Sequence, residues 1–173
     1  AMMYVRILVV VAIFNVALVR PLIAPMLALA LAAAAVAAFF HRAGKSEKTT
    51  VEAAPQNPLK LGTAVIFAVL LIAVSLVSKW VQAHLGAQGV LALAAVVGVT
   101  DIDPFVLSLA QGGAASIGIA MSAIAIVVAA SSNNILKAAY TIAFSRSRAS
   151  VIPAGILSAL CVLGIVAAAL MPR

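Results

Sequence analysis

The chain has 173 residues, of which 66% are hydrophobic and only 9% are charged. A soluble domain has about half of its residues apolar and about a quarter charged, so this composition excludes an ordinary soluble protein and predicts an integral membrane protein. The net charge of +7 does not indicate nucleic-acid binding, because the basic residues cluster near the ends of apolar segments, where they face lipid headgroups.

Runs of about 20 apolar residues are long enough to cross a bilayer as helices. These runs are continuous in Ala, Leu, Val and Ile and lack the period-two alternation of barrel strands. We therefore expect an all-α membrane protein with about six transmembrane helices, the fourth broken near its middle. The expected spans are residues 3–19, 22–40, 61–80, 89–111, 114–144 and 151–170. A small excess of basic residues on the side of the termini favours termini inside the cell, while the difference leaves both orientations open.

The chain divides into three expected parts. Residues 1–40 are expected to form a two-span helical hairpin that turns at Arg20-Pro21. Residues 41–60 are the one polar stretch of any length, and we interpret them as a basic linker. Residues 61–173 are expected to form a four-span bundle that carries a polar site.

The fourth expected span contains an unusual polar island, Thr100-Asp101-Ile102-Asp103-Pro104. Ionisable residues inside a membrane are costly and usually mark an ion, proton or substrate path. Pro104 removes a backbone donor, so we expect an unwound turn over residues 99–104. Discontinuous helices of this kind form the midplane sites of transporters. The alternative is a proline kink with satisfied polar groups.

The fifth expected span contains a second polar island, Ser131-Ser132-Asn133-Asn134, followed by Lys137. Asn133 and Lys137 are four residues apart and therefore share a helical face. Carboxylate, amide and hydroxyl oxygens are hard ligands that suit Mg²⁺, Mn²⁺ or Ca²⁺. We predict a divalent-cation site whose metal ligands are Asp101, Asp103, Asn133 and Asn134, with supporting roles for Thr100, Ser108, Ser132 and Lys137.

Lys137 is expected to occupy the cation position when the metal is absent. A structural salt bridge and a lysine that reaches outward to the interface are the alternatives. No catalytic motif is present in the sequence, so we expect no enzyme activity. The single cysteine, Cys161, has no partner in the chain and is interpreted as a small packing residue.

Three stretches resemble a known family. They are Asn57-Pro58-Leu59-Lys60-Leu61-Gly62-Thr63-Ala64, then Gly98-Val99-Thr100-Asp101-Ile102-Asp103 with Leu107-Ser108-Leu109-Ala110, and Ser132-Asn133-Asn134-Ile135-Leu136-Lys137-Ala138. Together they resemble the membrane domain of unknown function that forms the C-terminal half of many MgtC/SapB-family proteins. The resemblance implies a bacterial inner-membrane protein with a link to divalent metals, although the usual N-terminal MgtC-like half is absent.

From these observations we expect a transporter of divalent metal cations, with proton coupling as an option and the metal as transported substrate. Its expected partners are the lipid bilayer, the metal cation and a second copy in a homodimer, whose two copies could have opposite orientations. We expect no nucleic-acid partner. The two alternatives are a proton- or sodium-coupled carrier of another solute and a non-transporting membrane regulator.

Overall fold

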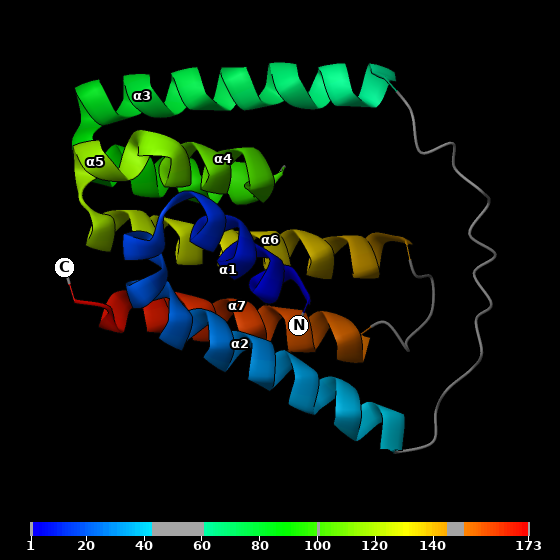
Figure 1. Ribbon diagram of the computed structural model, residues 1–173. Coiled ribbons are helices and arrows are strands. Elements are labelled where there is room, and N and C mark those ends of the chain that lie inside the picture. The colour runs from blue at the N-terminus through cyan, green and yellow to red at the C-terminus, as the bar shows by residue number, and fades with distance from the viewer. Residues whose placement is uncertain (1, 43–60, 100, 145–150, 173) are drawn as a thin grey trace.

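The computed structural model describes residues 2–42, 61–99, 101–144 and 151–172. All regular elements in these ranges are helices, and Figure 1 shows them as a bundle. Three stretches are long and apolar enough to cross a membrane, as expected of an integral membrane protein: Val16–Phe40, Ile119–Ala143 and Val151–Leu170. The remaining apolar stretches among the described residues are shorter, namely Met2–Phe14, Ala68–Val81 and Ala83–Gly98, so the six-span count is not confirmed.

The first two helices pack against each other, and the first of them is short. Helix α1 (Met2–Phe14) has 13 residues, which at 1.5 Å per residue is about 20 Å and less than the hydrocarbon thickness of a bilayer. The chain turns at Asn15, whose side-chain oxygen accepts a hydrogen bond from the Leu18 amide at 3.2 Å and so caps α2 (Val16–Arg42). The predicted first span over residues 3–19 and the predicted turn at Arg20-Pro21 are therefore wrong. Asn15 could have indicated the turn, since it is a good capping residue.

Helix α3 (Leu61–Gly98) is bent sharply at Gly86, which has φ 57° and ψ −150°. A residue with a Cβ would be strained at this positive φ, so glycine permits the bend. The part of α3 that follows Gly86 runs back into the bundle and ends at Gly98. The short helices α4 (Ile102–Ser108), η1 (Leu109–Gly113) and α5 (Ala114–Ile117) then lead to α6 (Ile119–Phe144).

In Figure 1, α4 lies beside the last part of α3, and the chain leaves the bundle on the side from which it entered. We call residues 87–98 and 101–113 the re-entrant hairpin. The expected break near residue 101 is confirmed by the end of α3 at Gly98 and the new start at Ile102. The expectation that residues 89–111 cross the membrane as one span with a break in it is wrong, because the two halves fold back on each other.

Helix α6 lies at the centre of the bundle. In its most apolar stretch 61% of the residues are buried, compared with 28% in α2 and in α7 (Val151–Leu170). Ala125, Ile126 and Val127 of α6 share one core cluster with Ile7 of α1 and Leu22 of α2. The N-terminal hairpin therefore packs directly on the rest of the bundle. Nearly all of the predicted linker, residues 43–60, lies outside the described residues.

Candidate functional site

The site begins at the break in the re-entrant hairpin. Asp101 has an extended backbone, with φ −137° and ψ 117°, and its carboxylate accepts a hydrogen bond from the Asp103 amide at 3.1 Å. This is the usual geometry of an N-cap, and it lets α4 start at Ile102. Pro104 lies in the first turn of α4, where its missing N–H leaves no partner unsatisfied. The local sequence therefore both ends α3 and starts α4.

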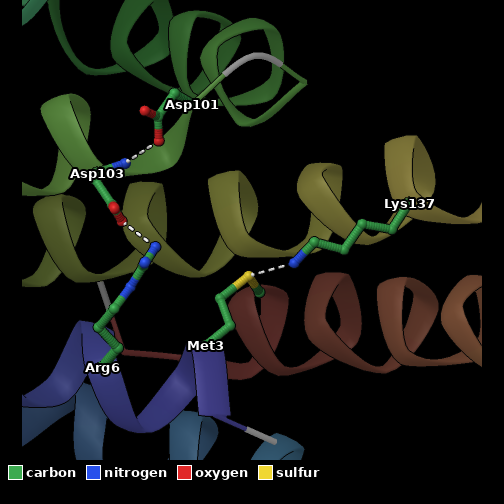
Figure 2. Close-up of polar contacts among 5 residues, drawn as sticks. All are labelled: Met3, Arg6, Asp101, Asp103 and Lys137. Atoms are coloured by element: carbon green, nitrogen blue, oxygen red, sulfur yellow. Dashed lines mark hydrogen bonds and ion pairs between the residues drawn. The ribbon is translucent and has the colours of Figure 1, made fainter. Parts of the chain in front are cut away.

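Asp103 is paired with a cation from another part of the chain. The guanidinium of Arg6, on α1, donates to the Asp103 carboxylate at 2.6 Å (Figure 2). The Arg6 side chain is 58% exposed and that of Asp103 is 35% exposed, so the pair lies on the accessible surface of the bundle. Sequence reasoning placed Arg6 among the interfacial anchors and missed this contact. Its position within an apolar run was the signal that could have indicated it.

Lys137 approaches the same region from α6 but pairs with neither aspartate. Its ammonium lies 3.1 Å from the Met3 sulfur, as Figure 2 shows. A thioether is a weak acceptor and cannot neutralise an ammonium. The counter-ion role that we expected from Lys137 is therefore supplied by Arg6 in this conformation.

Arg6, Asp101, Asn133 and Lys137 surround one open cavity of about 630 Å³. Its remaining walls are Met2, Met3, Val5, Val9, Val10 and Ile102. We call it the site cavity. Three elements meet there: α1, the start of α4 and the middle of α6. Asp103 lines a separate, smaller cavity of about 160 Å³ together with Arg6.

Two predicted site residues, Asn134 and Ser132, form hydrogen bonds that join the helices around the site. The Asn134 amide is buried and donates to the Tyr4 hydroxyl at 2.7 Å, which joins α6 to α1. The Ser132 hydroxyl donates to the carbonyl of Ala95 at 2.6 Å, a carbonyl in the last turn of α3. These bonds hold the walls of the site cavity in place.

Two further predicted residues are not among the walls of the site cavity. Ser108 is half-buried at the end of α4 and does not line the cavity. Thr100 lies outside the described residues.

The arrangement brings only part of the predicted metal shell together. Within the described ranges, no group of three or more Asp, Glu, His or Cys side chains could hold a metal ion. Asp101 and Asn133 share the site cavity, whereas Asp103 is occupied by Arg6 and Asn134 by Tyr4. A cation that used both carboxylates would first have to displace Arg6.

Comparison with known proteins places the chain in a family. Residues 1–145 match the model of a domain of unknown function, DUF4010. The chain belongs to this family. The match confirms that the chain carries a domain of unknown function, while the link to the membrane domain of MgtC/SapB-family proteins stays a prediction.

One relative of this DUF4010 chain is an uncharacterised protein of Aquifex aeolicus (strain VF5), which is 32% identical over 94 residues. That alignment covers 54% of this chain and 41% of the relative, so the chain spans well under two thirds of the relative's length. No solved structure matches the chain. The DUF4010 match covers α1, the re-entrant hairpin and α6, and hence every described residue of the site cavity, whereas α7 lies beyond it.

Proposed function

We propose that this DUF4010 protein is an ion-coupled secondary transporter that binds its cargo in the site cavity. The observation that carries the proposal is the re-entrant hairpin, whose break presents the Asp101 carboxylate to the site cavity and the Asp103 carboxylate to Arg6, within a bundle of apolar helices. Broken helices with ionisable residues are the usual sites of secondary transporters, because they place charged groups and free backbone ends at membrane depth. No catalytic step is part of the proposal.

The Arg6–Asp103 pair is the coupling element in this proposal. A proton or a cation that binds Asp103 competes with Arg6, because the carboxylate cannot serve both at full strength. When Arg6 leaves Asp103, the ion pair that joins the short helices α1 and α4 is lost. A ligand shifts such an equilibrium only through a difference in affinity for the two states, and competition with Arg6 supplies that difference.

Divalent-cation transport is a second candidate. It is supported by the hard oxygen atoms of Asp101 and Asn133, which share the cavity. In this version Arg6 leaves Asp103, and both carboxylates bind the metal. The expected location is the bacterial inner membrane, and the expected assembly is a homodimer. A mass of one copy in lipid would contradict the dimer.

Flux into proteoliposomes tests the proposal. The vesicles contain a trapped pH indicator or sodium indicator. Mg²⁺, Mn²⁺ or a pool of small amino acids is then added to the external buffer. We expect proton or sodium movement that depends on one of these solutes and falls at least about tenfold in Asp103→Asn, the change expected from the loss of one charge-assisted contact of about 1.5–3 kcal/mol. Arg20→Gln is the matched control, since Arg20 is exposed on α2 and does not line the site cavity. Solute-independent signals in the wild type, or full activity of Asp103→Asn, would contradict the proposal.

A further inference from the structure

Among the residues that the structure describes, the site cavity has two opposite charges that pair neither with each other nor with another ion. Asp101 accepts one backbone N–H bond, and no cation of the described chain lies within salt-bridge distance of it. Among the described residues, the Met3 sulfur is the one hydrogen-bond partner of the Lys137 ammonium. Asp101 is half-buried and Lys137 is exposed within the bundle, and each charge would be stabilised by a partner of opposite sign. The structure therefore leaves one free anion and one free cation on the wall of the same cavity.

Asn133 adds an unused polar group to this wall. Its residue is 8% exposed, and its side chain makes no hydrogen bond with any residue that the structure describes. It lies one helical turn before Lys137 on α6, so the two side chains share a face. The Asn133 amide is not among the fully buried polar atoms without a partner, so it is open to the cavity that it lines. Its donor and acceptor are both available to a ligand in the site cavity.

These three groups match a ligand that carries both charges. A cation alone would meet the repulsion of Lys137, and an anion alone would meet that of Asp101. A zwitterion compensates both groups and leaves the net charge of the site unchanged. The volume of about 630 Å³ is also that of a small-molecule site rather than of a bare ion.

We propose that the site cavity binds a small zwitterion that carries an ammonium and a carboxylate, such as an amino acid. Its ammonium binds Asp101, its carboxylate binds Lys137, and Asn133 binds a polar atom between them. This inference rests on the proposed transport function and specifies its cargo. The Arg6–Asp103 pair stays intact beside the ligand and remains available to the coupling ion.

Binding to the purified full chain in nanodiscs, measured by isothermal titration, tests the assignment. The probes are three zwitterions of increasing length, L-alanine, β-alanine and 4-aminobutanoate. Butylamine and butyrate serve as a cation and an anion of matched length, and Mg²⁺ is the metal probe. We expect at least one zwitterion to bind at least about tenfold more tightly than butylamine, butyrate and Mg²⁺, since each single ion satisfies only one of the two charges.

Two charge-removing variants provide a signature that a purely structural role would not produce. Asp101→Asn should weaken zwitterion binding and raise the affinity for butyrate relative to butylamine, whereas Lys137→Gln should do the reverse. Should either variant fail to fold, the comparison of probes on the wild-type chain decides alone. The inference is overturned if no zwitterion binds, or if butylamine or Mg²⁺ binds as tightly. Mg²⁺ binding with solute-dependent flux would reject the zwitterion and leave the transport function in place.

Discussion

At the scale of single residues, the position of α1 depends on a buried hydrogen bond between Tyr4 and Asn134. Both residues are buried, at 2% and 3% exposure, and the amide nitrogen lies 2.7 Å from the hydroxyl. Tyr4 is two residues before Arg6, so this bond also fixes where the guanidinium can reach Asp103. The contact joins the packing of α1 to the chemistry of the site.

Tyr4→Phe should lower the free energy of unfolding by about 1–3 kcal/mol, because it removes the acceptor and leaves the Asn134 amide buried without a partner. Denaturant or thermal unfolding in detergent measures the change. The double variant Tyr4→Phe/Asn134→Leu should recover much of the loss, since replacement of both partners by apolar groups removes the unsatisfied amide. If the double variant were less stable than the single one, the bond would not be the cause.

The polar residues of the site were predictable because they stand out against an apolar background. Asp101, Asp103, Asn133 and Lys137 are costly in a membrane, and sequence alone singled them out. Their pairing was not predictable. Arg6 is close to the start of the chain, where a basic residue is usually interpreted as an interfacial anchor. Its contact with Asp103 depends on the position of the short helix α1.

At the scale of the elements, the re-entrant hairpin depends on close contact between α3 and α6. A Cβ placed on Gly98 would lie 2.3 Å from the Ala129 carbonyl oxygen and 2.8 Å from the Ser132 Cβ. The same turn of α3 receives the hydrogen bond from Ser132 to Ala95. Small residues at such crossings let helix backbones approach.

Gly98→Ala should therefore destabilise the bundle by about 1–3 kcal/mol, because the backbone of α6 must move to admit the methyl group. Thermal unfolding in detergent gives the difference. Gly155→Ala is the matched control on α7, where an added Cβ has nothing within 4 Å, and it should be close to neutral. Equal effects of the two substitutions would show that the α3–α6 contact is not tight.

The sequence predicted the break in the hairpin but not its direction. Gly98, Asp101 and Pro104 indicate the end of one helix and the start of another. They do not say whether the chain continues across the membrane or folds back. That choice depends on contacts far apart in sequence, such as Arg6 with Asp103 and Ser132 with Ala95. A composition-based reading therefore joined residues 89–111 into one span.

At the scale of the whole molecule, the described helices form an apolar bundle with a charged cavity between α1, α4 and α6. The helical class and the long apolar stretches followed from composition, because few other folds satisfy backbone groups in lipid. The central place of α6 could not be predicted from its apolar character, since α2 and α7 are more apolar than α6 and yet far less buried. It follows from the polar and small residues that let α1, α3 and α7 pack against it.

The proposal that the site cavity binds a transported solute requires that water reaches this cavity from outside the bundle. In a Cys161→Ala background, a cysteine at Val9 lines the cavity, and one at Val162 lies on α7 away from it. The two side chains have similar exposure, 53% and 60%, so they differ mainly in what they face. Thiols react as thiolates, which form in water and not in lipid.

The decisive measurement is the rate at which a charged, membrane-impermeant methanethiosulfonate modifies each cysteine in proteoliposomes. We predict that Val9→Cys reacts at least about tenfold faster than Val162→Cys, with a small zwitterion slowing only the former. Equally slow reaction at both positions would contradict the account, because a cavity closed to water cannot serve as a transport site.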